Sequence, residues 1–338
     1  MPDEICYIDT RTVATLLEEI AVVDVVEEAL RSHALGRTVM PAEAYLRWTT
    51  DDGWARSLTL PAALGMPTGT AGIKVINGNV ANPGRGVARA SGLVLLFDVL
   101  TGQVRTVMAA ANLSAMRTAA VSIIGVRRLA PRPVEHALVI GAGPIGAAHV
   151  RLLCQEPTVR TVWVHDLDGD RAAAVAALTS DVRVRVDPVR DRASVIGDAD
   201  VIVAATTSVN AHLGLRHIRP GTLVVNVGLD DCAQDLLLGA DHLVVDSWAL
   251  VADDDKRLLG QLIRSGRVTA AGDSTSARAE QVVRAELGQL IAGSVMVSPR
   301  QDDRVVLNPF GMAVNDIALA TAVEQSAAAK GFGLPLPR

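Results

Sequence analysis

Three glycines at a fixed spacing are the first residues in this sequence that indicate chemistry. Gly141, Gly143 and Gly146 stand in the run ALVIGAGPIGAAHVRLL, in the order G-x-G-x-x-G, between a strand-like and a helix-like segment. In that context the first glycine permits a tight turn, and the second lets a pyrophosphate approach the backbone. The third allows close helix–strand packing, and the helix N-terminus faces the negative charge. The alternative is a tight turn that binds nothing.

A carboxylate follows at the position that such a loop requires. Asp166 lies about 20 residues beyond Gly146, at the end of the next strand-like segment, VWVHD. A carboxylate there accepts hydrogen bonds from the adenosine ribose hydroxyls and repels a 2′-phosphate, which favours NAD over NADP. Arg171 lies nearby and would soften that preference. Strand, glycines, helix and acid together predict a dinucleotide-binding domain that takes NAD.

Three cations outside that segment indicate a second site. Lys74 stands inside the apolar run AGIKVI, Arg47 inside YLRW, and Arg117 near the start of the helix-like run SAMRTAAVS. A buried ammonium must reach solvent or find a partner, and ammonium and guanidinium groups both pair well with carboxylates. Convergence on an anionic substrate is one interpretation, and three snorkelling surface residues are the other. The remaining lysines, Lys256 and Lys330, are expected to be solvated.

An acid follows another apolar strand, TLVVNVG. Asp230 would lie at the carboxyl edge of a parallel sheet, where ligands bind, and could act as a general base or orient water. Asp231 is a competing candidate, and an N-cap for a helix beginning near Cys232 is the non-catalytic alternative. The seven histidines form no cluster, and neither HExxH nor a paired-cysteine motif is present. A metal site or a Ser/His/Asp triad is therefore not expected.

The elements that must position these residues follow from hydrophobic periodicity. In the first third the pattern predicts helices over 15–34 and 113–129 and strands over 44–48, 71–76, 93–97 and 103–108. The last two strands flank a turn at 98–102 and are expected to pair antiparallel. Further on, strands over 136–140, 162–165, 182–186, 201–205, 223–227 and 243–245 alternate with helical stretches, and an amphipathic helix over 314–330 ends the pattern.

This alternation is typical of βαβ units in a parallel sheet. We therefore expect an α/β protein in which a Rossmann-type domain is inserted into a second, α+β domain. The predicted division is a substrate-binding and dimerisation domain over 1–124, an NAD-binding domain over 125–305, and a C-terminal segment, 306–338, that returns to the first domain.

Composition limits the class of protein. The 338 residues are 49% hydrophobic and 20% charged, with a net charge of −5. That balance suits a folded core and argues against a nucleic-acid partner, which would need a basic face. No apolar run is long enough to span a bilayer, and the acidic N-terminus carries no signal-peptide pattern. The cysteines, Cys6, Cys154 and Cys232, are widely spaced, as free thiols in a reducing cytoplasm would be.

Six segments together resemble a known family over nearly the full length of the chain. GIKVI, ARASGLVLL, MRTAAVSIIGVRRLA, VIGAGPIG, VNVGLDD and LNPFGMAVNDIA are similar to the ornithine cyclodeaminase/mu-crystallin family. DHLVVDSWALVADDDKRL and AELGQLIAG make the chain most similar to the dehydrogenase branch that produces 2,3-diaminopropionate for siderophores and peptide antibiotics.

The resemblance implies a homodimer and assigns roles to individual positions. It makes Asp230 and Lys74 catalytic, with Arg47, Lys74, Arg117 and Phe310 binding the substrate. The implied cofactor-binding residues are Ser91, Arg117, Thr118, Gly141, Gly143, Pro144, Ile145, Gly146, Asp166, Thr206, Val227 and Gly228. Ala109, Gln234 and Asn315 depart from residues common in the family, and Gln234 replaces a lysine of the cyclodeaminases.

The reaction implied by this branch is the NAD-dependent oxidative cleavage of N-(2-amino-2-carboxyethyl)-L-glutamate to 2,3-diaminopropionate and 2-oxoglutarate. Ornithine cyclodeamination, which returns the hydride and releases ammonia, is one alternative. A ketimine reductase or amino-acid dehydrogenase is a second, and a nicotinamide-binding protein without turnover is a third. The expected ligands are therefore NAD and a small amino acid, with no nucleic acid or membrane.

Overall fold

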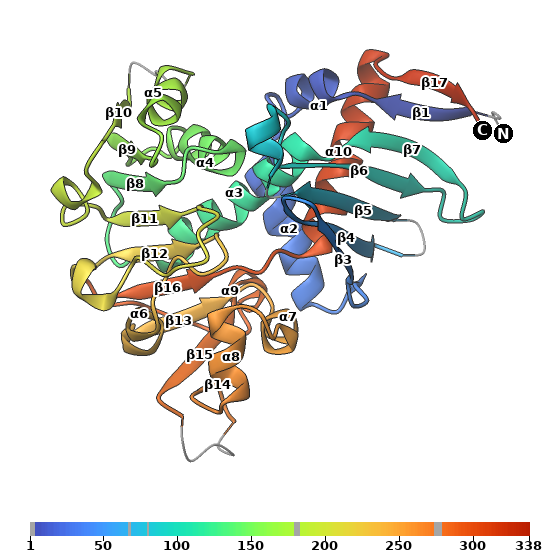
Figure 1. The fold of residues 1–338 in the computed structure, drawn as a ribbon. Helices are drawn as coiled ribbons and strands as arrows, with labels where there is room; N and C mark the ends of the chain where they lie inside the picture. The colour runs from blue at the N-terminus through green and yellow to red at the C-terminus, as the bar shows by residue number, and fades with distance from the viewer. Residues whose placement is uncertain (1–3, 67–68, 80, 179–182, 274–278) are drawn as a thin grey trace. The chain divides into compact units, whose positions relative to one another are not determined.

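The computed structural model describes residues 4–66, 69–79, 81–178, 183–273 and 279–338 (Figure 1). The chain forms two compact units, Met1–Arg117 with Met312–Arg338 (unit 1) and Thr118–Gly311 (unit 2). The sequence-based boundaries at 124/125 and 305/306 fall inside helix α3 (Ala111–Leu129) and strand β16 (Val305–Asn308). Each unit contains one β-sheet.

The sheet of unit 1 is mixed but mainly antiparallel. Among the described residues its strand order is β17-β1-β7-β6-β5-β4-β2, with β3 paired to β4, and only β1 and β7 run parallel. Its strands are β1 (Glu4–Ile8), β2 (Thr38–Val39), β3 (Ala44–Thr50), β4 (Gly53–Leu64), β5 (Thr70–Asn79), β6 (Ala90–Phe97), β7 (Val104–Ala109) and β17 (Leu334–Pro337). The helices of this unit are α1 (Thr10–Leu16), α2 (Val22–Ala34), the short η1 (Asn82–Arg85), the start of α3 and α10 (Ala313–Lys330).

Helix α10 forms the core of unit 1 together with one face of this sheet. It packs against β4, β5, β6, α1 and α2. Its first half is buried on all sides, whereas only its second half is amphipathic as the sequence predicted. Gly72 on β5 allows close contact, because a Cβ there would lie 3.1 Å from the Ile317 side chain. Every second residue of β5 therefore faces α10.

The predicted helix over 15–34 is wrong in its extent. The chain forms two helices, and the first is capped by Asp9, whose Oδ1 accepts a 2.7 Å hydrogen bond from Thr12 N. No glycine or proline marks the break after Leu17, so periodicity alone continues through it. Both helices pack on α10, and this tertiary packing overrides local helix propensity.

The sheet of unit 2 is parallel throughout its described strands, in the order β10-β9-β8-β11-β12-β16-β13-β15-β14. The strands are β8 (His136–Ile140), β9 (Thr161–His165), β10 (Arg185–Pro188), β11 (Val201–Ala204), β12 (Leu223–Asn226), β13 (His242–Val245), β14 (Val268–Ala270), β15 (Gln281–Glu286) and β16. The helices are α4 (Pro144–Leu153), α5 (Gly169–Leu178), α6 (Gln234–Gly239), α7 (Trp248–Asp253), α8 (Leu258–Arg264), α9 (Leu287–Ala292) and the short η2 (Arg192–Ser194) and η3 (Leu215–His217).

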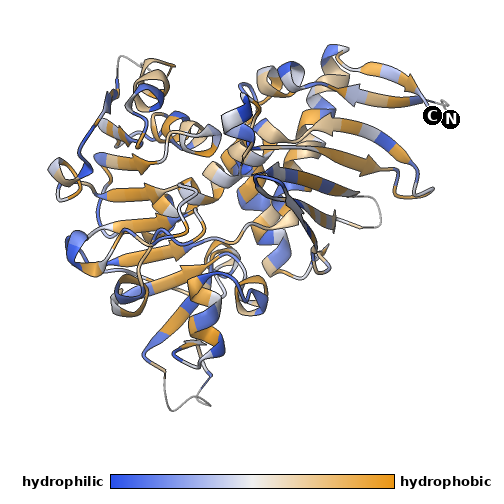
Figure 2. Cartoon of the chain, viewed as in Figure 1, coloured by the Kyte–Doolittle hydropathy of each residue, from blue (hydrophilic) through white to orange (hydrophobic). Residues whose placement is uncertain are grey.

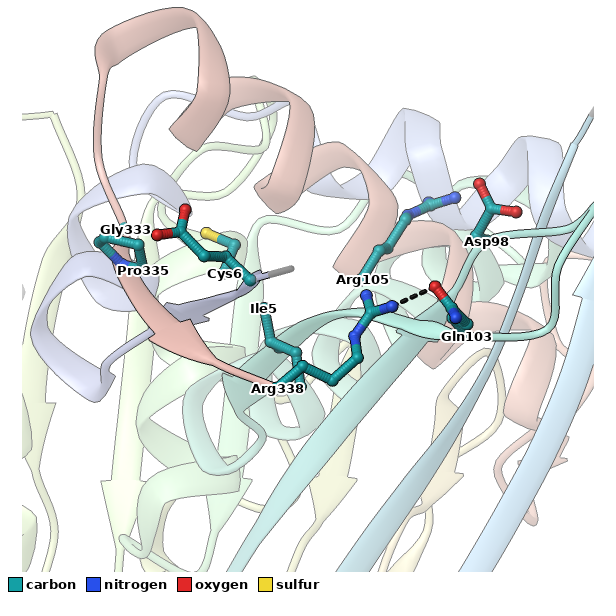
Figure 3. Close-up of a pocket in the computed structure, with 9 residues that line it drawn as sticks. Ile5, Cys6, Asp98, Gln103, Arg105, Gly333, Pro335 and Arg338 are labelled. Carbon is teal, nitrogen blue, oxygen red and sulfur yellow. Dashed lines mark hydrogen bonds between the residues drawn. The ribbon is translucent and has the colours of Figure 1, made fainter. Parts of the chain in front are cut away.

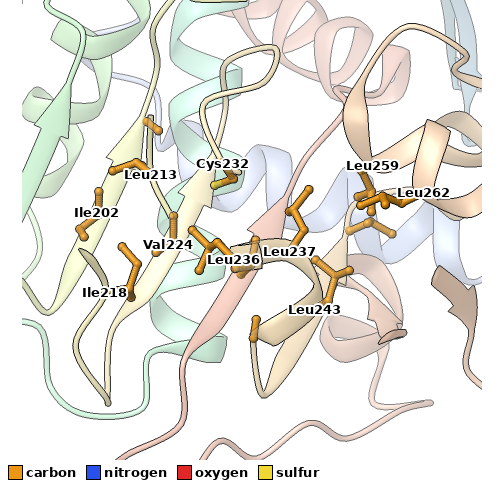
Figure 4. Packing of buried hydrophobic residues seen from close by; sticks show 14 of the residues in the cluster. Ile202, Leu213, Ile218, Val224, Cys232, Leu236, Leu237, Leu243, Leu259 and Leu262 are labelled. Carbon is orange, nitrogen blue, oxygen red and sulfur yellow. The ribbon is translucent and has the colours of Figure 1, made fainter. Parts of the chain in front are cut away.

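The central strands of this sheet are strongly hydrophobic, as Figure 2 shows for β8, β11, β12 and β16. On one side they build a core with α6 and α8, in which Ile202, Val224, Leu236 and Leu259 are buried (Figure 4). Strands buried on both faces read as continuous apolar runs, which is why the sequence predicted most of them. The predicted fold class, a Rossmann-type parallel sheet domain inserted in an α+β domain, is confirmed.

The strand expected over 182–186 begins at residue 182, which lies outside the described residues, and β10 starts at Arg185. Among the described helices, none combines the length and the apolar character that a bilayer crossing requires.

Candidate functional site

The parallel sheet brings the predicted cofactor residues of unit 2 to one edge. Because β9, β8, β11 and β12 are adjacent and parallel, their carboxyl ends lie side by side. The glycine loop follows β8, and Asp166, Thr206 and Val227 follow β9, β11 and β12. The chain connects outward in opposite directions from β8 and β11, so the crevice between these strands is the topological switch point where doubly wound sheets bind ligands.

The three glycines of the loop differ in their structural roles. Gly141 adopts φ +103°, which an L side chain rarely takes. A Cβ on Gly146 would lie 1.8 Å from Gly141 O, so only glycine allows α4 to pack this closely. A Cβ on Gly143 would meet nothing within 4 Å, although Gly143 is the N-cap residue of α4. The open space therefore lies where backbone N–H groups and the helix dipole favour an anion, which fits a pyrophosphate.

The exposed residues of the loop complete this cradle. Pro144 and Ile145 form the first turn of α4, and Ile145 is 38% exposed although it is apolar. Asp166 lies beside them, since its Oδ2 accepts a 2.7 Å hydrogen bond from Ala142 N. Arg171 forms an ion pair of 3.1 Å with Asp168. This pairing reduces the ability of Arg171 to attract a 2′-phosphate.

Replacing Gly143 by alanine tests the cradle. The residue has φ −76° and ψ −177°, so alanine causes no backbone strain, but its methyl group occupies the space expected for the pyrophosphate. We expect the dissociation constant of NAD to rise about tenfold or more while thermal stability is unchanged. Gly197→Ala is the control, because a Cβ there also meets nothing within 4 Å. Equal NAD affinities of the two variants in calorimetry would contradict the assignment.

A buried histidine fixes the helix that follows the loop. His149 on α4 has an Nδ1 that lies 2.7 Å from Ile145 O and an Nε2 that lies 2.7 Å from Ser122 Oγ on α3. Burial lowers its pKa from 6.5 to about 4, so the ring is neutral at pH 7. The neutral ring donates from Nδ1 and accepts the Ser122 hydroxyl proton at Nε2, which ties α4 to α3.

The titration of His149 predicts a loss of stability in acid. The folded-state pKa lies below the unfolded value, so as pH falls the unfolded chain takes up the proton first. The free energy of unfolding therefore declines from pH 6.5 downward, by at most roughly 3 kcal/mol once pH has passed the folded-state pKa. Urea unfolding of wild type and His149→Gln across this range measures the effect. Parallel pH curves for the two proteins would show that His149 contributes nothing.

Thr206 is held from behind by a chain of polar side chains. Its hydroxyl donates to Asp231 Oδ1, which also lies 2.9 Å from His212 Nε2. Arg192 Nη1 in turn donates to His212 Nδ1 at 2.6 Å, which leaves the imidazole proton on Nε2 to be donated to Asp231. Asp231 Oδ2 would lie 1.9 Å from a Cβ on Gly228, so Gly228 is required for this packing. The network positions the loops after β11 and β12.

The two acids that competed for the catalytic role differ in the structure. Asp231 is fully buried and engaged with Thr206 and His212, whereas Asp230 is half-buried. Asp230 Oδ1 accepts a 2.8 Å hydrogen bond from Leu258 N, which orients the carboxylate. The N-cap interpretation is wrong, because α6 begins at Gln234 and Ala233 is its N-cap. Of the two, Asp230 is the one able to contact a ligand.

Phe310 follows β16, the next strand along the same edge. Its backbone N–H donates to Asp246 Oδ1 at 2.8 Å, and Gly311 N donates to Asp246 Oδ2 at 2.7 Å. The ring packs under the guanidinium of Arg257, 4.3 Å from its Cζ. Buried Asp246 therefore fixes the NPFG turn, and sequence reasoning missed it although it directly follows a predicted strand.

Lys74 and Arg117 meet at a buried carboxylate in unit 1. Lys74 Nζ lies 2.7 Å, and Arg117 Nε 2.9 Å, from Asp316 Oδ1 on α10. The Arg117 Nε–H is not aligned on that oxygen, so this contact is an ion pair without a hydrogen bond. Asp316 was not predicted as a site residue. Its signal in the sequence is a carboxylate within AVNDIALA, the mostly apolar first part of the helix.

The surroundings of Lys74 lower the pKa of its ammonium group. Burial, followed by the charge of Arg117, lowers its pKa from 10.5 to about 8, although Asp316 and Glu43 oppose the shift. Lys74 Nζ also donates to Ser114 Oγ at 3.3 Å. Asp316 is therefore shared by two cations, and Glu43 adds a second negative charge that acts on Lys74.

Arg47 does not join this cluster. Its guanidinium stacks on the Trp54 ring, with Cζ 4.6 Å from the ring centroid. Arg47 pairs in register with Arg56 on β4. Both arginines lie on the same sheet face as Lys74, but they are level with Gly78 near the C-terminal end of β5. The remaining predicted cofactor residues are Ser91, exposed on β6, and Thr118, half-buried on α3.

A cavity of about 440 Å³ lies at the edge of the unit 1 sheet, where Arg105, Gln103 and Arg338 surround the end of β1 (Figure 3). Arg105 is occupied by Glu324, whose oxygens lie 3.0 and 2.8 Å from its Nε and Nη2. Burial, and secondly Glu324, raise the pKa of Cys6, which stays a thiol. No predicted site residue lines this cavity.

Comparison with known proteins finds similarity along nearly the whole chain. The family model described as ornithine cyclodeaminase/mu-crystallin matches residues 8–331. The N-((2S)-2-amino-2-carboxyethyl)-L-glutamate dehydrogenase of Staphylococcus aureus is 29% identical, over 93% of this chain and 92% of its own length. The crystal structure of CmnK superposes with a TM-score of 0.88 at 34% identity, covering 99% of this chain and 98% of that one.

A more distant structure shares the fold. The archaeal alanine dehydrogenase dimer with bound NAD has a TM-score of 0.82 at 22% identity and covers 98% of this chain and 99% of its own. Because the family model spans nearly the entire chain, the predicted resemblance is confirmed. The chain belongs to the ornithine cyclodeaminase/mu-crystallin family.

Proposed function

We propose that this protein is an NAD-dependent dehydrogenase that oxidatively cleaves N-(2-amino-2-carboxyethyl)-L-glutamate to 2,3-diaminopropionate and 2-oxoglutarate. The observation that carries the proposal is the similarity to the Staphylococcus aureus dehydrogenase along almost the full length of both chains. The class of reaction rests on more relatives than the choice of substrate does. Relatives along nearly the full length include an alanine dehydrogenase and a Delta(1)-pyrroline-2-carboxylate reductase, so the chain is an oxidoreductase acting on a CH–NH bond with NAD.

The residues of unit 1 would bind the substrate through a carboxylate. Lys74 and Arg117 share one oxygen of Asp316, and ammonium and guanidinium groups have further N–H donors beyond that contact. A carboxylate beside the reacting carbon would accept hydrogen bonds from these donors. Such binding fixes the orientation of the α-carbon of the glutamate half, which supplies much of the rate enhancement in reactions of this kind.

The residues of unit 2 would hold the cofactor and assist hydrolysis. When bound, NAD accepts the hydride that the glutamate α-carbon loses. The α-carbon and its nitrogen then share a double bond, water adds to that carbon, and the C–N bond breaks to release 2-oxoglutarate and diaminopropionate. Asp230 would take the proton of the attacking water, since its carboxylate is oriented by Leu258 N and remains half-exposed.

A homodimer in the cytoplasm is the assembly that we propose. The sheet face of unit 1 opposite α10 carries Leu46, Trp48 and Leu93, which are 62%, 45% and 42% exposed. An apolar sheet face of this kind suits a second copy of the chain. Cys6, Cys154 and Cys232 form no disulfide, which fits a reducing compartment. A molar mass of two chains in light scattering would support the dimer, and a monomer would refute it.

The product assay separates this reaction from its rivals. Purified protein with NAD and the glutamate conjugate should give NADH, 2-oxoglutarate and 2,3-diaminopropionate in equal amounts. Ornithine converted to proline and ammonia without net NADH would show a cyclodeaminase instead. Diaminopropionate is a building block of siderophores and peptide antibiotics, so we place the enzyme in such a biosynthesis.

A further inference from the structure

A second group of cations lies on the same sheet face as Lys74, beyond the Lys74–Arg117–Asp316 cluster. Arg56 on β4 pairs in register with Gly78 on β5, and Gly78 is separated from Lys74 by an even number of residues. The side chains of Arg56 and Lys74 therefore lie on the same face of the sheet, and their positions are about 13 Å apart along the strand direction. Arg89 lies just before β6 and beside Gly78, because the backbone oxygen of Arg89 would be 3.4 Å from a Cβ on Gly78.

These arginines line a small pocket. Its walls are formed by Trp54, Arg56, Ile76, Asn77, Gly78, Asn79, Arg89 and Ala90. Arg56 Nε lies over Gly78, because it would be 4.0 Å from a Cβ on that residue, an ordinary contact distance. Between this pocket and Lys74, the same face of β5 carries Ile76, an apolar surface suited to a methylene chain.

The charges in this pocket are not balanced. Neither Arg56 nor Arg89 forms an ion pair with a carboxylate in the described part of the chain, whereas neighbouring Arg85 binds Asp52 at 2.6 Å. Burial and, secondly, the charge of Arg56 lower the pKa of Arg89. Arg47 adds a third positive charge from β3, directly opposite Arg56. Half-buried arginines that repel one another are costly unless an anion joins them.

We propose that Arg56 and Arg89 form a second carboxylate-binding subsite, which holds a carboxylate of the substrate other than the one bound by Lys74 and Arg117. The identity of this ligand rests on the proposed function, because the glutamate conjugate carries three carboxylates. The subsite makes the enzyme selective for substrates with two or more negative charges. Alanine or ornithine offers only one carboxylate and would leave the arginines unpaired.

The kinetic test uses Arg56→Gln and Arg89→Gln with the glutamate conjugate. We expect KM to rise about 10- to 100-fold with kcat changed less than about threefold, because the lost contact is far from the reacting carbon. Arg89→Lys should recover part of the affinity. Arg85→Gln is the matched control and should behave as wild type. Unchanged KM in both glutamine variants would overturn the subsite.

Two analogues identify which carboxylate is bound. N-(2-aminoethyl)-L-glutamate lacks the carboxylate of the diaminopropionate half, and N-(2-amino-2-carboxyethyl)-L-2-aminobutyrate lacks that of the glutamate side chain. The analogue without the bound group should react weakly with wild type and lose nothing further in Arg56→Gln. Equal additional losses for both analogues in this variant would contradict a specific contact.

A binding measurement separates this proposal from the proposed reaction. Calorimetry with glutarate and with butyrate compares a dicarboxylate with a monocarboxylate without any turnover. We expect wild type to bind glutarate more tightly and Arg56→Gln to lose that preference. If the conjugate is not oxidised but this preference holds, only the reaction is wrong. If the conjugate is oxidised while both its KM and the glutarate affinity are independent of Arg56 and Arg89, only the subsite is wrong.

Discussion

Replacing Lys74 by methionine is expected to lower kcat/KM for the glutamate conjugate by about 100- to 1000-fold, which corresponds to roughly 3–4 kcal/mol. Methionine keeps most of the side-chain volume but removes the charge that would bind the substrate carboxylate. The fold should persist, because Arg117 remains paired with Asp316. Steady-state kinetics measure the effect. The surface variant Lys330→Met, which removes an exposed lysine paired with Glu19, should retain wild-type kinetics.

The pH profile of the same reaction provides an independent readout. Because the pKa of Lys74 is about 8, its positive charge disappears as pH rises through that value, and kcat/KM should fall on the alkaline side. Arg117, Asp316 and Glu43 are the charged groups that set this pKa. In Lys74→Arg the alkaline fall should vanish, since arginine stays protonated. Activity of Lys74→Met within about threefold of wild type would reduce Lys74 to a structural partner of Asp316.

Asp316→Asn is expected to lower the free energy of unfolding by about 3–5 kcal/mol, the largest stability effect that the structure predicts. The substitution leaves Lys74 and Arg117 buried beside each other without the carboxylate that both contact, and Glu43 acts on Lys74 less strongly than Asp316 does. It should also lower the pKa of Lys74 further, because Asp316 opposes the present shift. Denaturant unfolding measures the first effect, and the alkaline limb of the pH profile measures the second.

The control for Asp316 is an exposed ion pair. Asp52 binds Arg85 at 2.6 Å, but both side chains are nearly half exposed, so Asp52→Asn should cost less than about 1 kcal/mol. Combining Asp316→Asn with Lys74→Met should be less destabilising than the sum of the single changes, because one of the two uncompensated charges is removed. Simple additivity would mean that the buried cluster is not coupled.

The sequence predicted the parallel sheet well because its strands are buried on both faces and read as apolar runs. Strand β4 was missed, since Pro61 and polar residues interrupt its pattern and a proline argues against a central strand. The break between α1 and α2 was missed for the opposite reason, because nothing local marks it. The local sequence pattern therefore predicted strands that are buried on both faces. It failed where strand pairing or helix packing between distant segments determines the structure.

The candidate site divides in the same way. The glycine loop and Asp166 were predictable because their spacing along the chain is itself fixed by the chemistry of dinucleotide binding. Asp316 was not, because its partner Lys74 is distant in the sequence and only the packing of α10 on β5 joins them. The place of Arg47 beside Arg56 depends on strand register, which no residue of β3 specifies by itself.

The central claim is that the hydride leaves the α-carbon of the glutamate half, and isotope tracing tests it most directly. The conjugate carrying deuterium at that carbon is incubated with NAD, and the products are separated and analysed by mass spectrometry. Our account predicts one deuterium in NADH and none in 2-oxoglutarate or 2,3-diaminopropionate. Deuterium retained in either amino-acid-derived product, with unlabelled NADH, would contradict it.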